Sequence, residues 1–507
     1  MSTSTTAVIL DCYTVEPSGL GVPPYLSAYV RNAYSALLRS LPGADVRYVT
    51  IDDVRWNLAD GVAAPQPPLS DALTYSATTN RDQALDLLRD AVIVVVIAGD
   101  AVPSVHLHAR NGDLAEITRA LACVRGTRVL LGPLVAYATA EPDAYRGLFD
   151  AVHSHTVTAA DLTAGSDVAA PYRQLLADRD SFSGLVEQLR WRPIAEIELY
   201  RGCTRRKFCS FCNEPVKAPV VDYRDVADVL DEIARLSNAG VRDFRLGQQT
   251  CFFSYQGRDP QRIEQLLAGI RETCPDLSVL HIDNADPLAV ASPSGKRIAE
   301  LVARYCTEGN CAPMGVETFD PVVVARNALT CTPEVLLRAV ENVNDAGAVR
   351  GAGGLPLLLP GLNLIYGLPG ETHRTHLANL TWLSTLFESG VLCHRTNVRQ
   401  ARAFPGTPLA QIQQQEPPPS LDHFATWKAD IDQTWDAPMK ERVYPRGLNV
   451  TDLHSFFVTD RGTWFRRLGS YSIQIVERGT ALPLYQPADL VVTGHAPRHL
   501  YGERHAA

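Results

Sequence analysis

Strand-like apolar runs alternate with helical stretches along most of this 507-residue chain. Helical periodicity fills much of 24–40, 81–90 and 113–124. Strands that are apolar throughout are typical of parallel sheets, because helices cover both of their faces. The start of the chain is therefore predicted to form a doubly wound α/β domain. Its strands are expected at "AVILDCY" (7–13), "VRYVTI" (46–51), "AVIVVVIAG" (91–99) and "RVLLGPLVA" (128–136).

A second alternating series follows a predicted linker at 166–190. It repeats strand then helix six times, which predicts a (β/α)6 partial TIM barrel; a full barrel would need two more units. The strands are expected at 194–200, 241–247, 277–283, 312–318, 361–367 and 394–400.

The last part of the chain changes character after a helical stretch around 420–436. Short runs such as "TWFRRLGSYSIQIVE" and "ADLVVTGHA" alternate apolar and polar residues, which favours a small antiparallel β-barrel. The predicted fold class is α/β: a flavodoxin-like (Rossmann-like) domain, the partial TIM barrel and a small C-terminal β-barrel. The predicted boundaries are 1–165, 166–190 for the linker, 191–437 and 438–507.

Composition limits the cellular compartment and the classes of binding partner that we expect. The net charge of −9 gives no general attraction to nucleic acid, so a nucleic-acid partner is not expected. No stretch approaches the ~20 apolar residues that a membrane span needs, and the N-terminus lacks a basic region before its apolar run. We therefore expect a cytoplasmic protein. In that reducing setting its 11 cysteines indicate metal or redox chemistry wherever they cluster.

Three cysteines cluster just after the first strand of the second series. Cys203, Cys209 and Cys212 have the spacing C-x5-C-x2-C. A structural zinc site usually has four ligands in two pairs, and no second pair follows. A four-iron cluster with one iron left open for a substrate fits a thiol triplet better. Zinc and unliganded cysteines remain the alternatives.

The triplet resembles the cluster motif of the radical S-adenosylmethionine (SAM) enzymes. An aromatic residue precedes the last cysteine in that motif, and Phe211 stands there; the usual spacing is C-x3-C-x2-C, two residues shorter. Downstream segments resemble the fourth, fifth and sixth barrel strands of these enzymes. They are "GVETFDP" (315–321), "LNLIYGLPGET" (362–372) and "NVRQARAFPGTPL" (397–409).

The resemblance implies both the cofactors and the chemistry. Three thiolates would hold a [4Fe–4S] cluster, and SAM would chelate the fourth iron and be cleaved reductively to a 5′-deoxyadenosyl radical. An electron donor such as flavodoxin or ferredoxin is implied as a partner. The resemblance further implies SAM-binding roles for Phe211 in the pocket, Gln248 or its neighbour Gln249 at the amino group, Glu317 at the ribose and Arg399 at the carboxylate.

Other polar residues near the strand ends have two interpretations each. His281, Asp283 and Asn284 could face the substrate or form a buried network. For the basic run Arg205 to Lys207, an exposed loop is favoured over a role beside the cluster. For the remaining cysteines of the barrel, buried free thiols are favoured over an auxiliary cluster; these are Cys251, Cys306 and Cys311.

A flavodoxin-like domain ahead of such a barrel resembles the cobalamin-binding radical SAM group. Segments such as "FRLGQQTCFFSY" and "LGSYSIQIV" are similar to an archaeal family of B12-binding-domain/radical SAM proteins without a settled function. Domains that coordinate cobalt use Asp-x-His-x-x-Gly after the first strand, where this chain has "DCYTVEPSG". His106 and His108 follow the third strand instead. Related methylases bind cobalamin without that histidine, so the cofactor stays open.

The methylthiotransferases share this plan, including a TRAM-like C-terminal barrel. They carry a second cluster on three N-terminal cysteines, whereas only Cys12 and Cys123 precede the triplet here. Basic residues such as Arg466 and Arg467 are too few to indicate RNA binding by the TRAM-like domain, which is expected to cover the barrel mouth or contact a protein.

The sequence thus predicts a radical SAM enzyme acting on a small molecule, with cobalamin-dependent C-methyl transfer as the first hypothesis. The alternative is a cobalamin-independent enzyme in which hydrogen abstraction leads to rearrangement, bond formation or dehydrogenation. A methylthiotransferase-like enzyme or a non-catalytic iron–sulfur protein is less favoured.

Overall fold

The computed structural model describes residues 5–14, 22, 24–58, 77–99, 110–132, 134, 145, 147–153, 157–159, 162, 182–479, 481–496 and 498–504. The chain forms two compact units. The first comprises Met1–Glu198, Ala227–Phe244 and Thr273–Leu277, and the second Leu199–Val226, Arg245–Glu272 and Ser278–Ala507. None of the helices in the described part of the chain is long and apolar enough to cross a membrane.

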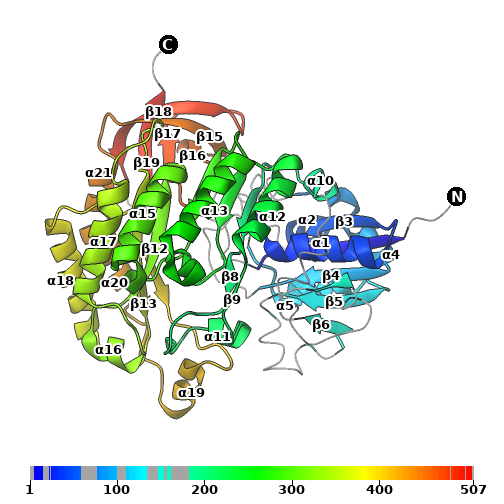
Figure 1. Ribbon diagram of the computed structural model, residues 1–507, viewed down its shortest axis with the longest axis horizontal. Helices are drawn as coiled ribbons and strands as arrows, with labels where there is room; N and C mark the ends of the chain where they lie inside the picture. The colour runs from blue at the N-terminus through cyan, green and yellow to red at the C-terminus, as the bar shows by residue number, and fades with distance from the viewer. Residues whose placement is uncertain are drawn as a thin grey trace. The chain divides into compact units, whose positions relative to one another are not determined.

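A five-stranded parallel sheet forms the core of the first unit (Figure 1). Its order is β3-β1-β4-β5-β6, which is the order 2-1-3-4-5 of flavodoxin-like folds. The predicted parallel α/β sheet is therefore confirmed. The strands are β1 (Thr6–Asp11), β3 (Asp45–Thr50), β4 (Ile93–Ile97), β5 (Thr127–Leu131) and β6 (Ala151–His153). Only the three-residue β6 had no strand pattern in the sequence.

Side-chain caps mark the start of three helices of this unit. Ser27 caps the first helix, Thr50 and Asp53 form a capping box at the second, and Asp113 and Glu116 form one at α5. The helices are α1 (Ala28–Ser40), α2 (Ile51–Asn57), α4 (Ala84–Asp90), α5 (Leu114–Leu121), α10 (Ser183–Val186) and α12 (Val226–Asn238), with η1 (Arg81–Gln83) before α4.

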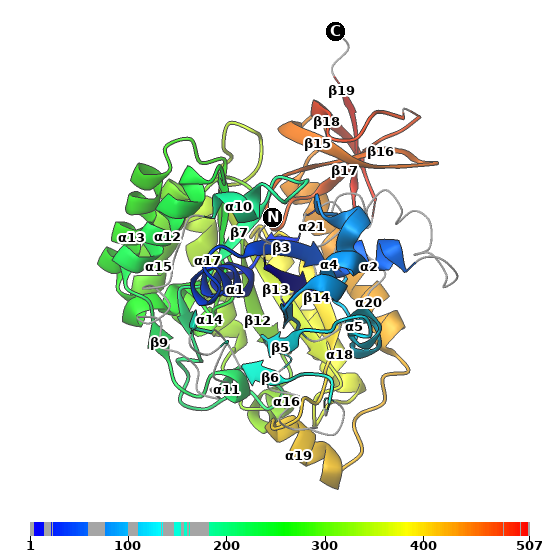
Figure 2. The same cartoon turned by 90° about the vertical axis from the view of Figure 1, so that its right-hand side faces the viewer.

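All six strands predicted for the second series are present. They are β7 (Ile194–Ile197), β10 (Asp243–Leu246), β11 (Val279–Ile282), β12 (Asn310–Glu317), β13 (Leu358–Tyr366) and β14 (Thr396–Gln400). One sheet has the order β11-β10-β7-β2, where β2 is Tyr25–Leu26 and β10 carries the boundary between the units. The other, β12-β13-β14, is parallel (Figure 2). A parallel bridge from Ala285 to Met314 joins the end of β11 to β12.

Helices follow the strands of the second unit as the alternating pattern predicts. They are α13 (Pro260–Thr273), α14 (Pro287–Val290), α15 (Pro293–Tyr305), α16 (Pro321–Arg326), α17 (Pro333–Gly347) and α18 (His373–Glu388). Polar side chains cap the N-termini of α14 to α18, as Asp320 does for α16.

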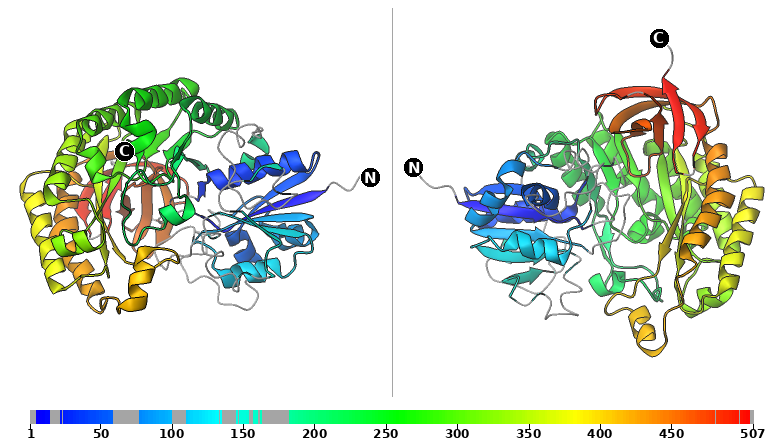
Figure 3. Two further views of the ribbon diagram at one scale, coloured as in Figure 1. Left: turned by 60° about the horizontal axis from the view of Figure 1, so that its bottom comes forward. Right: turned by 180° about the vertical axis from the view of Figure 1, so that it is seen from behind.

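The C-terminal strands close into a barrel of order β15-β16-β17-β19-β18 (Figure 3). Four of its strand pairs are antiparallel, but β17 and β19 pair in parallel, so the prediction of an all-antiparallel barrel was wrong for this pair. The strands are β15 (Asn449–Thr459), β16 (Gly462–Arg467), β17 (Gln474–Glu477), β18 (Pro487–His495) and β19 (Leu500–Arg504). Before them come α19 (Pro408–Gln415), α20 (Phe424–Ile431), a π-helical turn (Asp432–Asp436) and α21 (Ala437–Val443).

A buried ion pair in the first unit allows a direct test of how α1 packs against α12 and β7. Arg31 of α1 donates to Glu232 of α12 at 2.9 Å and to the carbonyl of Glu196 in β7 at 2.8 Å, and the two side chains are 1% and 4% exposed. Removing one partner leaves the other charge buried, so Arg31→Met should lower the free energy of unfolding by about 3–5 kcal/mol.

Chemical denaturation of the full chain measures this loss. The double variant Arg31→Met/Glu232→Gln should be more stable than Arg31→Met, because it removes the uncompensated charge. Equal stability of Arg31→Met and the wild type would contradict this account of the packing.

Candidate functional site

The cysteine loop runs between two short antiparallel strands, β8 (Tyr200–Arg201) and β9 (Asp222–Tyr223). Hydrogen bonds fix its centre. The Ser210 amide donates to the Asn327 carbonyl at 3.0 Å, and the Ser210 hydroxyl donates to Asn327 Oδ1 at 2.6 Å. The Leu409 amide donates to the Ser210 carbonyl at 2.8 Å. The loop is thus held by Asn327, directly after α16, and by the first turn of α19.

The thiols of Cys203, Cys209 and Cys212 are all partly buried. Burial raises the pKa of Cys209 to about 11, and that of Cys212 to about 12. Burial also raises the pKa of Cys203, which acts electrostatically on Cys209. Iron binding would displace these protons, because a thiolate is the form that ligates metal.

No three His, Cys, Asp or Glu side chains of the described residues are grouped to hold a metal ion. A [4Fe–4S] cluster is ligated by one thiolate at each iron, so its ligands need not converge on one point as those of a single ion do. The assignment of the cysteine triplet to a cluster therefore stays a prediction.

Arg205 departs from the exposed loop that was favoured for this basic run. Its Nη1 donates to Cys209 Sγ at 2.9 Å, and its Nε pairs with Asp286 at 3.0 Å. The interpretation as an exposed loop was wrong for Arg205, because a carboxylate after β11 draws its guanidinium inward. Arg206 and Lys207 are exposed as expected.

Two predicted site residues at strand ends combine a left-handed backbone conformation with a buried oxygen that has no hydrogen-bond partner in the described part of the chain. Gln248 after β10 and Glu317 at the end of β12 have φ of 69° and 65°. Within the described residues, Gln248 Oε1 and Glu317 Oε2 are buried with no hydrogen-bond partner. Strain and open hydrogen-bonding groups persist when a ligand site needs them. Both oxygens can accept hydrogen bonds from a SAM molecule, so these residues fit that ligand.

The carboxyl of Glu317 is buried and its pKa is perturbed. Burial raises the pKa of its carboxyl to about 7, and Arg399 and Arg205 oppose part of the rise. Arg399 lies on β14 and is exposed, and Phe211 is half-buried in the cysteine loop. Gln249, by contrast, is fully buried and bonded to the Leu246 carbonyl at 2.7 Å, which leaves Gln248 as the open glutamine.

A buried asparagine supports the strained turn at Glu317. Oδ1 of Asn379, from α18, accepts from the Thr318 hydroxyl at 3.0 Å and from the Phe319 amide at 2.8 Å. Its Nδ2 donates to the Tyr366 hydroxyl at 3.2 Å. No sequence pattern indicates Asn379, because only the fold brings it next to Glu317.

The polar residues that end β11 form a buried network. Tyr471 donates to Asp283, which also pairs with Arg245 at 2.6 Å. His281 accepts from the Ser470 amide at 3.2 Å, and burial lowers its pKa to about 4. Of the two interpretations, the structure supports the network, which joins the C-terminal barrel to β11.

The other cysteines that the structure describes in the second unit are buried and form no disulfide bonds, and the interpretation of Cys251, Cys306 and Cys311 as free thiols stays a prediction. Cys251 Sγ accepts from the Asp286 amide at 3.1 Å. Cys331 is a further buried thiol of this unit, and it interacts electrostatically with Glu317 and Arg205. It belongs to no motif, so no sequence signal could have found it.

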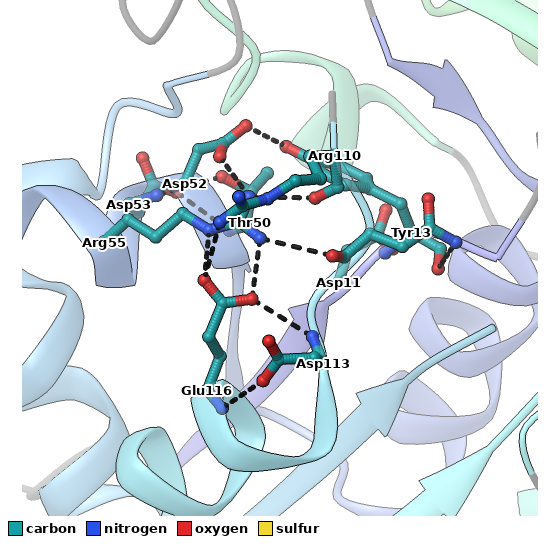
Figure 4. Close-up of polar contacts among 10 residues, drawn as sticks. Asp11, Tyr13, Thr50, Asp52, Asp53, Arg55, Arg110, Asp113 and Glu116 are labelled. Atoms are coloured by element: carbon teal, nitrogen blue, oxygen red, sulfur yellow. Dashed lines mark hydrogen bonds and ion pairs between the residues drawn. The ribbon is translucent and has the colours of Figure 1, made fainter. Parts of the chain in front are cut away.

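In the first unit, polar side chains gather at the carboxyl ends of β1 and β3 (Figure 4). Tyr13 stands where the cobalt-binding histidine would be, has a φ of 62°, and donates its hydroxyl to Asp52 at 2.9 Å. Asp11 accepts from the Tyr48 hydroxyl at 2.8 Å, and burial raises its pKa to about 6. His106 and His108 lie outside the described residues.

Arg55 is the centre of this polar group. It binds Glu116 with two bonds of 2.8 Å and Asp52 at 2.7 Å, and it donates to the carbonyls of Arg110 and Asn111. The Asn111 side chain in turn donates to the Tyr13 carbonyl at 3.1 Å. The segments after β1 and β4 are thereby fixed together at the edge of the sheet where such folds bind ligands.

The perturbed carboxyl of Glu317 predicts a pH dependence for the metal-free protein. Its pKa is higher in the folded state (about 7) than in the unfolded state (4.5), so the folded state binds more protons between these values. Stability should therefore fall as the pH rises from 4.5 to 7, by on the order of 2 kcal/mol for this group.

The variant Glu317→Gln should lose this contribution to the fall in stability between pH 4.5 and 7. Urea unfolding at several pH values measures it. Glu272→Gln, at an exposed position on α13, is the control and should keep it. A Glu317→Gln protein with the same pH dependence as the wild type would contradict the raised pKa.

Comparisons with known proteins agree with this architecture. The family model described as "Radical SAM superfamily" matches residues 197–382. Two solved structures with 17% and 14% sequence identity have a similar fold. The methyltransferase TsrM from Kitasatospora setae has a TM-score of 0.51 over 81% of this chain and 76% of its own. OxsB, a cobalamin-dependent SAM radical enzyme, has a TM-score of 0.50 over 75% of this chain and 52% of its own.

One relative is similar to this chain over nearly its full length, which identifies a narrower family. The uncharacterised protein MJ0274 of Methanocaldococcus jannaschii is 33% identical over 98% of this chain and 93% of its own length. The chain therefore belongs to the radical SAM superfamily, in the same family as MJ0274.

Proposed function

We propose that this protein is a radical SAM enzyme that holds a [4Fe–4S] cluster on Cys203, Cys209 and Cys212. The observation that carries the proposal is the pair of buried, unpartnered oxygens on Gln248 and Glu317, at strand ends of the unit that contains the cysteine loop. When bound, the cluster would supply the electron that cleaves SAM into methionine and a 5′-deoxyadenosyl radical.

The chain's own residues would bind and orient SAM. Gln248 Oε1 would accept a hydrogen bond from the SAM ammonium group, and Glu317 would accept from the ribose hydroxyls. Hydrogen bonds from such donors favour the ionised carboxylate and would return the pKa of Glu317 towards its ordinary value. Arg399 would pair with the SAM carboxylate, and Phe211 would line the pocket.

We further propose that the reaction is a cobalamin-dependent C-methyl transfer to a small molecule. The flavodoxin-like strand order of the first unit and the fold similarity to TsrM and OxsB support this. When bound, cobalamin would carry the methyl group. The Tyr13 hydroxyl is already bonded to Asp52, so that position offers no ligand for cobalt, and binding would rest on the sheet edge and its loops.

The second candidate is a radical SAM enzyme that acts without cobalamin, and the commitment of Tyr13 to Asp52 favours it. The radical would then lead to rearrangement, bond formation or dehydrogenation of the substrate. Both candidates take an electron donor such as flavodoxin or ferredoxin and act in the cytoplasm.

Metal analysis of protein made anaerobically with cobalamin supplied tests the two candidates. We expect about four irons per chain for a [4Fe–4S] cluster. Cys212→Ala should lose most of the iron, whereas Cys123→Ala, outside the loop, should keep it. One cobalt per chain would support methyl transfer, and iron without cobalt would favour the second candidate. Zinc in place of iron after reconstitution would contradict both.

The support that Asn379 gives to Glu317 predicts an effect on SAM affinity. Asn379→Leu removes both acceptor bonds to the turn after Glu317 and should raise the Kd for SAM about tenfold, or about 1.4 kcal/mol. Asn379→Asp keeps an oxygen for the Thr318 hydroxyl and the Phe319 amide and should bind SAM nearly as the wild type does.

Equilibrium dialysis with the reconstituted protein measures the affinity, and thermal unfolding checks that both variants fold. A folded Asn379→Leu protein with unchanged affinity would exclude this role for Asn379. Equal weakening by Asp and Leu would show that the acceptor oxygen is not what matters.

A further inference from the structure

The cysteine loop is longer than usual for its family, and the extra length has a structural consequence. Five residues separate Cys203 from Cys209, and Arg205 is among them. Its side chain folds back on the loop, so that Nη1 donates to Cys209 Sγ at 2.9 Å. The loop thus places a positive charge on one of the proposed cluster ligands.

Asp286 holds the guanidinium in this position. Its Oδ2 pairs with Arg205 Nε at 3.0 Å, and the two side chains are only 9% and 20% exposed. Asp286 is itself fixed, because its Oδ1 accepts from the Leu288 amide at 3.0 Å and its own amide donates to Cys251 Sγ at 3.1 Å. Arg205 is therefore preorganised before any metal binds.

Burial makes these charges effective at the sulfur. Arg205, Asp286 and Glu317 all act electrostatically on the Cys209 thiol. Charges this shielded from water interact more strongly than exposed ones. The next residue, Arg206, is exposed to solvent, so water screens its charge.

We infer that Arg205 and Asp286 together set the reduction potential of the cluster. This inference rests on the proposed function, since it requires iron on Cys209. Reduction adds one electron, taken from an external one-electron donor, and so adds one negative charge. A guanidinium that donates to a ligand sulfur stabilises the reduced form and raises the potential, whereas the Asp286 carboxylate lowers it.

The two residues should therefore shift the potential in opposite directions. Arg205→Met should lower the reduced fraction at a fixed solution potential about tenfold, which is about 59 mV for a one-electron couple. Asp286→Asn removes the negative charge, while the bond from Arg205 Nη1 to Cys209 Sγ still holds the guanidinium at the sulfur, so it should raise that fraction. Asparagine can still cap α14. Arg206→Met removes the same charge from an exposed position of the loop and should leave the potential unchanged.

A redox titration of the reconstituted full chain, followed by electron paramagnetic resonance, measures these potentials alongside the iron content. Unchanged potentials in Arg205→Met and Asp286→Asn with full iron content would overturn the inference, as would shifts of the same sign. If Arg205→Met fails to bind iron, the inference is tested with Arg205→Lys and Asp286→Asn instead. Arg205→Lys keeps the positive charge, so it should shift the potential less than Asp286→Asn does. A larger shift in Arg205→Lys would overturn the inference. A wild-type protein without iron would instead overturn the proposed function.

Discussion

Asn327 is the residue on which the geometry of the cysteine loop depends. It is fully buried, accepts two hydrogen bonds from Ser210, and donates to the carbonyls of Val323 and Pro369. One side chain thus joins the loop to α16 and to the segment after β13. Because three thiols can share a cluster only at fixed separations, a loop pinned at its centre is a requirement for the proposed chemistry.

At the strand ends of the second unit, some polar side chains have hydrogen-bond partners, while neighbouring ones keep an oxygen that the described residues leave without a partner. Gln249 and Asn284 are bonded to nearby backbone, whereas Gln248 and Glu317 each keep a buried oxygen without a partner among the described residues. Buried polar groups are otherwise paired in folded proteins, since an unpaired one costs about 1–3 kcal/mol. In the part of the chain that the structure describes, Gln248 and Glu317 combine an unpartnered buried oxygen with a left-handed backbone conformation at a strand end, and this combination is what indicates a ligand site.

Much of the fold could be predicted because buried parallel strands have a continuous apolar pattern. All six strands of the second series were found in this way, and β6 was missed because three residues are too few to show a pattern. The parallel pairing of β17 with β19 depends on how the barrel closes, which no local pattern encodes. Gln248 and Glu317 came from a family resemblance. The contacts of Arg205, Asn379 and Tyr471 join residues far apart or depend on a neighbouring carboxylate, so the sequence could not reveal them.

The central claim is that SAM binds at an iron held by this loop. Electron paramagnetic resonance of the reduced, reconstituted protein with and without SAM tests it most directly, because a ligand on the cluster changes its spectrum. The account predicts the signal of a reduced four-iron cluster that changes when SAM is added, and no such signal in Cys209→Ala. A cluster signal that SAM leaves unchanged, or no reducible cluster after anaerobic reconstitution, would contradict it.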